Sequence, residues 1–145
     1  MRDTKQVIVI RRDLRMRRGK EIAQGAHAAM SFLTKPVYDG QEPMALIRHD
    51  VPPKPEKDYD IYSMALNPAT LNWIKNGFRK ITCQVDTEED LRAIKALADD
   101  EGVICHVIED NGTTEFHGEP TITCLAIGPD WSDKVDKVTK DLKLY

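Results

Sequence analysis

The chain has 145 residues and a formal charge of −3, and 41% of its residues are hydrophobic. This length and composition favour one domain that buries its own core. No apolar stretch is long enough to cross a bilayer, and the polar first six residues do not start a secretory signal, so we expect a cytoplasmic protein with no membrane partner.

The first predicted elements are a strand and a helix. Residues 7–10 are four β-branched residues in a row, so residues 5–12 are predicted to form a central strand buried on both faces. A helix follows over about 17–35 and is expected to end before Pro36, because the residue before a proline disfavours the helical conformation. Five apolar residues have the spacing of a buried helical stripe: Ile22, Ala26, Ala29, Met30 and Leu33.

The next segment is rich in proline. We interpret about 36–66 as an insert with one short helical turn around residues 44–47. After it, Asn67 is predicted to cap a helix that starts with Pro68, runs to about Asn76 and stops at Gly77.

The second half alternates strands and helices. It predicts strands over 78–85, 103–109 and 121–128, a helix over 88–101 capped by Thr87 and ended by Gly102, and a last helix over 131–142 opened by Pro129 and Asp130. The last two strands follow each other with no helix between them, so they can pair antiparallel. The sequence therefore favours an α/β sandwich around a small mixed sheet, in one domain over residues 1–145.

The first predicted helix carries a polar column. Lys20, Gln24 and His27 are spaced i, i+4 and i+7, so they share one face, which is either a solvated surface or part of a site. Upstream lies a basic cluster: Arg11, Arg12, Arg15, Arg17, Arg18 and Lys20. Positions 11–20 carry +5 and the rest of the chain −8. Such a local field would attract a polyanion.

A second polar group lies between the last two strands. Asp110, Asn111 and Gly112 form a strong turn signal, and a plain loop is one interpretation. Short polar side chains nevertheless gather there: Asp110, Asn111, Thr114, Thr121 and Thr123. If this loop faces the polar column, the two groups would suffice for water-mediated acyl transfer.

The cysteines and histidines show no metal-site pattern. Cys83, Cys105 and Cys124 each lie in a predicted strand, and no Cys-x-x-Cys pair occurs, so we expect reduced core thiols. The four histidines lack metal-ligand spacing. The sequence predicts no cofactor and no bound metal.

Three separated blocks resemble the archaeal/eukaryotic-type peptidyl-tRNA hydrolases, the second of two unrelated families of that name. The blocks are residues 5–28, residues 110–129 with the pattern Asp110-x-Gly112-x-Thr114 and Thr121-x-Thr123, and residues 136–144. The resemblance implies a three-layer α/β/α fold around a four-stranded mixed sheet. It also implies metal-independent cleavage of the ester between peptide and tRNA, with tRNA as the partner; homodimers are common in the family.

The resemblance also assigns site residues. Six residues match positions in or around the family's site: Lys20, Gln24, His27, Asp110, Thr114 and Thr123. We expect His27 to accept a proton from the attacking water, with Asp110 as the alternative base, and Lys20 to hold the developing oxyanion or the terminal phosphate. Asn111, Gln24 and the threonines would position water and the acyl end. The five arginines between positions 11 and 18 would bind the tRNA backbone.

The chain also departs from the family's usual pattern. Glu109 and Asn111 stand where the family has glutamine and alanine, Pro120 replaces a glycine, and the preceding loop looks one residue longer. Two alternatives therefore stay open: a non-catalytic tRNA- or RNA-binding protein of the same fold, and a hydrolase of esters without RNA. A nucleotide-binding module is disfavoured, because no glycine-rich phosphate loop occurs. A cysteine-based hydrolase is disfavoured by the three cysteines in strands.

Overall fold

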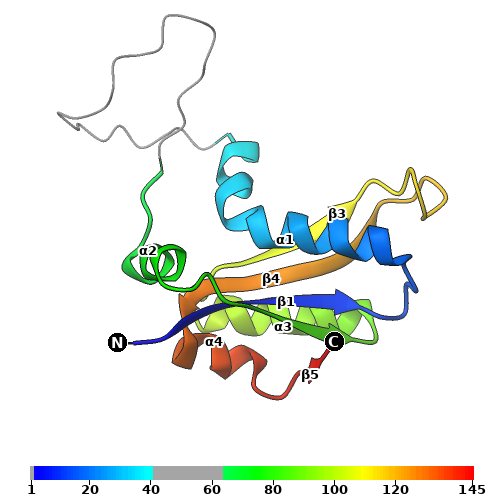
Figure 1. Ribbon diagram of the computed structural model, residues 1–145. Helices are drawn as coiled ribbons and strands as arrows, with labels where there is room; N and C mark the ends of the chain where they lie inside the picture. Colours follow the sequence, from blue (N-terminus) through cyan, green and yellow to red (C-terminus); the bar gives the residue numbers. More distant parts are fainter. Residues whose placement is uncertain (1, 41–63) are drawn as a thin grey trace, which may run out of the picture.

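The computed structural model describes residues 2–40 and 64–145, which form an α/β fold around one mixed sheet (Figure 1). The elements are β1 (Thr4–Arg11), α1 (Arg18–Tyr38), α2 (Pro68–Lys75), β2 (Lys80–Val85), α3 (Glu88–Asp100), β3 (Cys105–Asp110), β4 (Thr121–Trp131), α4 (Ser132–Thr139) and β5 (Lys143–Leu144). Most of the predicted insert, including the helical turn around 44–47, lies outside the described residues. None of the helices described has the length and apolarity needed to span a bilayer.

The sheet contains parallel and antiparallel pairs, as the sequence predicts. Its strand order is β3-β4-β1-β2-β5, with β1 parallel to β2 and antiparallel to β4. The pair β3–β4 is antiparallel. The expected number of four strands is wrong, because β5 adds a fifth by pairing with Cys83 and Gln84 of β2. A strand of two residues has no periodicity that a sequence pattern can reveal.

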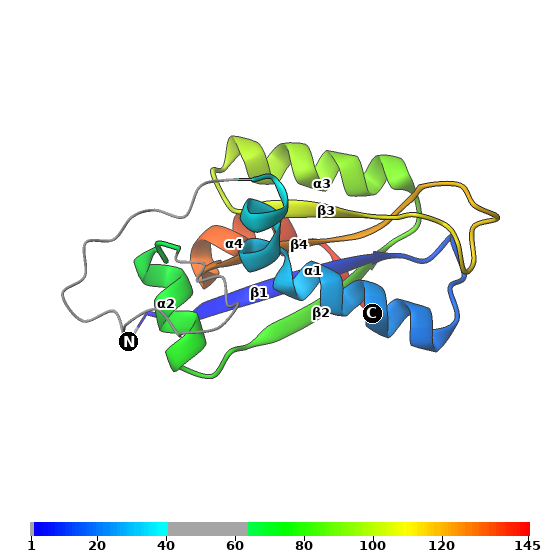
Figure 2. The ribbon, with the colours of Figure 1, turned by 90° about the horizontal axis from the view of Figure 1, so that it is seen from above.

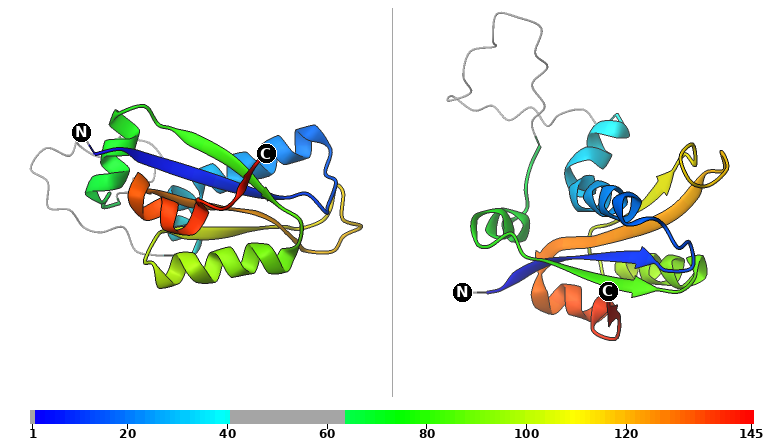
Figure 3. Two further views of the ribbon diagram at one scale, coloured as in Figure 1. Left: turned by 90° about the horizontal axis from the view of Figure 1, so that it is seen from below. Right: turned by 45° about the vertical axis from the view of Figure 1, so that its right-hand side comes forward.

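Helices lie on both faces of the sheet. Helices α1 and α2 lie above it in Figure 1, and α3 and α4 lie below; Figure 3 shows the same arrangement from two other sides. Because successive strand residues point to opposite faces, β1 contributes to both cores. Val7 and Val9 pack in the cluster with Leu91 and Val135, whereas Ile8 packs in the cluster with Ala28. The prediction that this strand is buried on both faces is confirmed.

Two predicted helix boundaries are wrong. Helix α1 runs through Pro36 to Tyr38, because a proline removes only its own backbone donor and the hydrogen bonding resumes when Asp39 N donates to Lys35 O at 2.9 Å. Residues 129–131 extend β4 instead of opening the last helix. They pass a register shift and pair again with the start of β1, so α4 begins only at Ser132.

The two capped helices start where the sequence predicts. The Asn67 side chain accepts a hydrogen bond from Thr70 N at 2.8 Å. Thr87 and Asp90 form a reciprocal capping box at the start of α3. These contacts are local in sequence, which is why the pattern alone identifies them.

The buried face of α1 differs from the predicted apolar stripe. Ile22 is 68% exposed and Met30 47% exposed, while the buried residues are Gln24, Ala28, Ser31 and Phe32. Only Ala29 and Leu33 of the predicted stripe are half-buried, and Ala26 is exposed. Helix α1 thus buries Gln24 of its polar column against the sheet and leaves Ile22 and Met30 exposed.

Candidate active site

The polar column of α1 meets the polar loop between β3 and β4. Lys20 Nζ lies 2.6 Å from Asp110 Oδ1 and 2.9 Å from Thr114 Oγ1. The Gln24 amide donates to the same Asp110 oxygen at 3.0 Å. In Figures 1 and 2, the first turns of α1 and the β3–β4 loop lie at the same end of the molecule. Segments about 90 residues apart therefore form one cluster.

Thr123 fixes the orientation of the Gln24 amide. Its buried hydroxyl donates to Gln24 Oε1 at 2.5 Å. With its oxygen occupied in this way, Gln24 presents its NH₂ group to Asp110. Gln24 is only 2% exposed and Thr123 is fully buried, so water does not replace these bonds. The pair forms the inner wall of the cluster.

The β3–β4 loop is folded tightly around Gly112. Gly112 N donates to Asp110 Oδ2 at 3.0 Å, and Gly112 O accepts from the backbone of Phe116 and Gly118. Gly112 has a φ of +80°, and a Cβ there would lie 2.2 Å from Glu119 O, so only glycine fits. Phe116 packs on the core beneath α1 and lies 5.7 Å from Lys20 Nζ. These contacts hold the loop against the start of α1.

The cluster keeps Asp110 ionised. Burial of the carboxyl disfavours its charge, but hydrogen bonds from Lys20, Gly112 and Gln24 and the charge of Lys20 outweigh this effect and hold the pKa of Asp110 below its usual 3.8. The side chains of Lys20 and Asp110 are 13% and 11% exposed. The result is a fixed, largely shielded ion pair at the mouth of the site.

Two predicted site residues lie outside this hydrogen-bonded cluster. His27 is exposed and, within the described residues, makes no hydrogen bond. It lines a groove of about 740 Å³ between α1 and β3, whose other lining residues include Met30, Ile108 and Glu109. Asn111 uses its amide oxygen to accept from the backbone and hydroxyl of Thr113, so it braces the loop.

The predicted basic residues divide into two groups. Arg11 is buried on the α3 side, where its guanidinium donates to Asp13, Glu88 and the Ile122 carbonyl. These bonds raise the pKa of Arg11, with the Asp13 bond as the largest cause, although burial opposes them. Arg11 is thus a structural residue. The exposed arginines are Arg12, Arg15, Arg17 and Arg18.

The exposed arginines surround the start of α1. Arg12 lies over the Tyr145 ring at 4.7 Å, and Arg17 pairs with Glu115 at 2.8 Å. Arg15 and Arg18 make no ion pair with any residue in the ranges 2–40 and 64–145. At the start of α1 the Arg17 side chain makes no cap, and Glu115 accepts from Arg17 N at 3.4 Å. The next N–H groups of the helix have no such partner among the described residues and are available to an anion beside Lys20.

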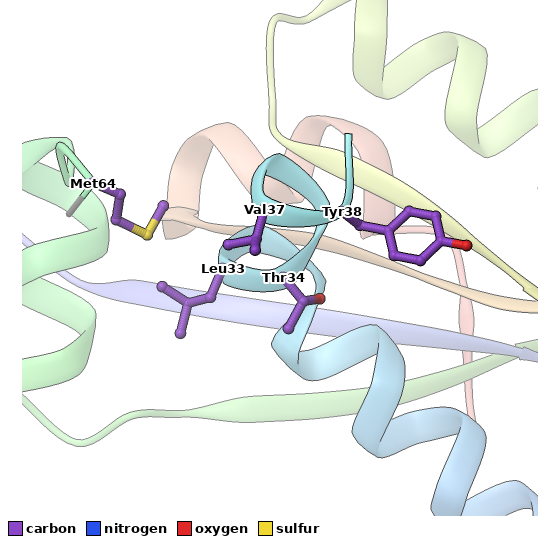
Figure 4. Close-up of a pocket in the computed structure, with 5 residues that line it drawn as sticks. All are labelled: Leu33, Thr34, Val37, Tyr38 and Met64. Atoms are coloured by element: carbon purple, nitrogen blue, oxygen red, sulfur yellow. The ribbon is translucent and has the colours of Figure 1, made fainter. Parts of the chain in front are cut away.

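The second hollow and the three cysteines lie outside the candidate active site. A second hollow, of about 590 Å³, is lined by Leu33, Thr34, Val37, Tyr38 and Met64 at the far end of α1 (Figure 4). The three cysteines are free and buried, and burial raises the pKa of Cys105 to about 12 and that of Cys124 to about 11. In the part of the chain described, no three His, Cys, Asp or Glu side chains are grouped to hold a metal ion.

Sequence reasoning assigned no role in the site to three residues that contribute to it. The Gly112 amide binds Asp110, Phe116 anchors the loop, and Glu109 lines the groove beside His27. The Asp-x-Gly spacing is the signal for the first, because a turn of this kind brings the glycine N–H back to the aspartate side chain. The other two depend on tertiary packing.

Comparison with known proteins assigns the family. The family described as "Peptidyl-tRNA hydrolase PTH2" matches residues 4–145. The chain is 34% identical to the peptidyl-tRNA hydrolase of Thermoplasma acidophilum, with 97% of both chains covered. It is 35% identical to that of Methanocaldococcus jannaschii, covering 97% of this chain and 98% of the relative. It is 32% identical to a probable peptidyl-tRNA hydrolase 2 of Dictyostelium discoideum, covering 99% of this chain and 55% of the relative. The chain belongs to the PTH2 family of peptidyl-tRNA hydrolases.

Proposed function

We propose that this chain hydrolyses the ester bond between peptide and tRNA in peptidyl-tRNA and so releases free tRNA. The observation that carries the proposal is the contact of Lys20 with Asp110 beside an uncapped helix start and a ring of exposed arginines. The family and its relatives support the same activity. An ester needs no covalent enzyme intermediate, so direct attack by water is sufficient.

The positive groups at the start of α1 would stabilise the charge that develops on the ester. Lys20 lies in the first turn of α1, so it and the first N–H groups of the helix would together meet the carbonyl oxygen or the terminal phosphate. Asp110, which Gln24 holds in turn, positions Lys20, and Thr114 adds a second contact. Because the groups are fixed before substrate binds, they need little reorganisation during the reaction.

His27 is our choice of base. Asp110 already accepts three hydrogen bonds, and its lowered pKa makes it a weak acceptor for a proton from water. His27 lies one helical turn beyond Gln24, exposed at the start of the groove. Asp110 acting alone is the alternative. It predicts a rate that stays flat between pH 5 and 8, because its carboxylate remains ionised throughout that range.

The exposed arginines would bind the tRNA backbone without reading its sequence. We assign this role to Arg12, Arg15, Arg17 and Arg18 and withdraw it from Arg11, which is held by other residues. We further propose that residues 1–145 form one three-layer α/β/α domain, interrupted by the insert at about 36–66, that acts in the cytoplasm. A homodimer stays a prediction, which sedimentation velocity tests.

The proposed activity is tested with an N-acetyl-aminoacyl-tRNA in a single turnover at excess protein. Hydrolysis predicts that free tRNA appears much faster than in buffer. A protein that only binds RNA would slow the spontaneous loss of the ester. Matched assays of Lys20→Ala, Asp110→Asn and His27→Ala test the residues. If all three variants cleave within about twofold of the parent, the catalytic centre lies elsewhere.

A further inference from the structure

The substrate of the proposed reaction has two chemically different arms. One is a polyanionic RNA and the other a peptide, and the ester lies where they join. The exposed arginines gather at the N-terminal end of α1. Lys20 lies in its first turn and contacts Asp110 at the end of β3, so the ester is expected there. The peptide must then leave in another direction.

The groove between α1 and β3, which we call the α1/β3 groove, extends in that direction. The catalytic face of α1 continues into it along one column with spacings of three and four residues. The column is Lys20, Gln24, His27, Ser31, Thr34 and Tyr38. On the strand side, Glu109 lines the groove and is adjacent in sequence to Asp110. The groove therefore begins at His27 and Glu109, beside the candidate active site.

The lining of the groove suits a peptide. From α1 come the apolar Ala26 and Met30 together with polar side chains, and Met30 is 47% exposed. The polar ones are His27, Ser31, Thr34, Lys35 and Tyr38. The other wall contains the consecutive residues 107, 108 and 109. Side chains of consecutive strand residues alternate between faces, so the presence of all three fits a wall formed by the strand's edge.

Strand β3 lies at the edge of the sheet. It pairs with β4, and no other strand in the described part of the chain pairs with its outer edge. An extended peptide beside such an edge can use main-chain hydrogen bonds, which depend little on its sequence. That property suits an enzyme whose substrates carry many different peptides.

We propose that the α1/β3 groove binds the last residues of the peptide arm in extended form, between the edge of β3 and the face of α1 that carries Ala26 and Met30. This inference rests on the proposed function. From His27 to Tyr38, α1 rises about 17 Å, which matches about five residues of extended peptide. Beyond Thr34 and Tyr38, the groove adjoins the apolar hollow of Figure 4, which shares these two residues.

The test compares two substrates with the same tRNA and the same esterified amino acid. One carries a single acetylated residue, which ends near His27, and the other an acetylated pentapeptide. The proposal predicts that kcat/KM is about tenfold higher for the pentapeptide, mainly through KM, because added apolar contacts bind it. Equal values for the two substrates would overturn the inference while leaving the proposed hydrolysis intact. Failure to cleave either substrate would instead reject the proposed function.

Substitutions locate the effect. Met30→Glu places a charge in the groove at an exposed position and should reduce the preference for the pentapeptide to about one. The matched control is Leu97→Glu, an exposed apolar residue of α3 on the other face of the sheet, which should keep the preference. Melting curves check that both variants fold. If Met30→Glu keeps the preference, the peptide does not lie in this groove.

Two further measurements distinguish an extended peptide from other occupants of the α1/β3 groove. A pentapeptide with N-methyl groups on alternate amides should lose the preference if the β3 edge supplies main-chain bonds; a retained preference contradicts that edge contact. Sedimentation velocity compares the oligomeric states of the parent and Met30→Glu. If the substitution dissociates a dimer and leaves the substrate preference unchanged, the groove is an interface between two copies, and the inference is wrong.

Discussion

Thr123 acts on the candidate site indirectly, through its hydrogen bond to Gln24. Its hydroxyl donates to Gln24 Oε1, and this bond directs the Gln24 amide toward Asp110. Asp110 in turn holds Lys20 at 2.6 Å. A buried hydroxyl thus determines the position of the cation at the mouth of the site.

The variant Thr123→Val keeps the shape of the side chain and removes this donor. Gln24 Oε1 would then be buried without a partner, so we expect unfolding free energy to fall by about 1–3 kcal/mol. We expect kcat to fall about tenfold with little change in KM, because the amide no longer fixes Asp110. Single-turnover and melting measurements check both effects, and Thr123→Ser should restore kcat. A Thr123→Val enzyme with full kcat would show that this bond has no positioning role.

The sequence predicts the residues of the cluster better than their surroundings. The spacing of Lys20, Gln24 and His27 identifies their shared face, and the Asp-x-Gly turn identifies the loop. It does not predict that Gln24 is buried while Ile22 is exposed, because the partners of the Gln24 amide lie 86 and 99 residues away. For the same reason Arg11 looks like a phosphate contact until its distant partners Glu88 and Ile122 are seen.

At the scale of elements, the β3–β4 loop is the part that the site most depends on. The loop contains two glycines with a positive φ, Gly112 and Gly118, so the effect of adding a side chain can be compared at these two positions. At Gly112 an added Cβ would lie 2.2 Å from Glu119 O, whereas at Gly118, with a φ of +82°, it would meet nothing within 4 Å. Only the first position combines backbone strain with a collision.

Gly112→Ala should therefore displace the loop and break the bond from its N–H to Asp110. We expect kcat to fall at least tenfold, because Asp110 loses one of its three donors and the loop shifts. Gly118→Ala should cost about 1 kcal/mol of stability from the backbone conformation alone and keep most activity. Steady-state kinetics and urea unfolding of both variants check this. Equal losses of activity in both variants would show that backbone strain, and not the collision at Gly112, reduces activity.

Strand β3 also carries a group that makes stability depend on pH. Burial, followed by the charges of Lys95 and Lys35, holds the pKa of His106 below its usual 6.5. The unfolded chain then binds a proton in a pH range where the folded chain does not, so stability is full above about pH 6.5 and falls as the pH drops toward the folded value. Urea unfolding at pH 7.5 and 5.5 should show this loss, and His106→Gln should reduce it. An unchanged loss in the variant would assign it to other groups.

Local signals explain which elements the sequence predicts. Asn67 and Thr87 cap their helices through contacts three residues away, and both helices start where expected. The end of β4 and the whole of β5 depend on pairing with β1 and β2, which a local pattern does not contain. At Pro36 the local signal is misleading: it predicts the end of the helix, but α1 continues to Tyr38.

At the scale of the whole molecule, the charge is separated. The chain carries −3, yet exposed arginines cluster where β1 passes into α1. The residues outside positions 11–20 sum to −8, so under the proposed function the basic end would determine how the tRNA approaches. The fold class itself follows from the alternation of strands and helices, which the structure confirms as an α/β fold with one mixed sheet.

This separation of charge predicts how the salt concentration affects tRNA binding. Affinity should fall steeply between about 50 and 200 mM salt, because bound cations are released from the phosphates. Arg15→Gln and Arg18→Gln should each reduce the slope of log affinity against log salt by about one. Arg11→Met is the control: it should keep the slope but lower unfolding free energy by about 1–3 kcal/mol, since the buried Ile122 carbonyl loses a donor. An affinity that does not depend on salt would reject the arginine contact with phosphate.

The central claim is that Lys20 and Asp110 act as one catalytic unit, although they lie 90 residues apart in the chain. A double-mutant cycle on single-turnover ester cleavage, with Lys20→Ala, Asp110→Asn and the combined variant, tests it most directly. The account predicts that the combined variant is about as slow as the slower single variant, because removing either partner already disables the pair. Rate losses that multiply independently, or single variants that keep the parent rate, would contradict it.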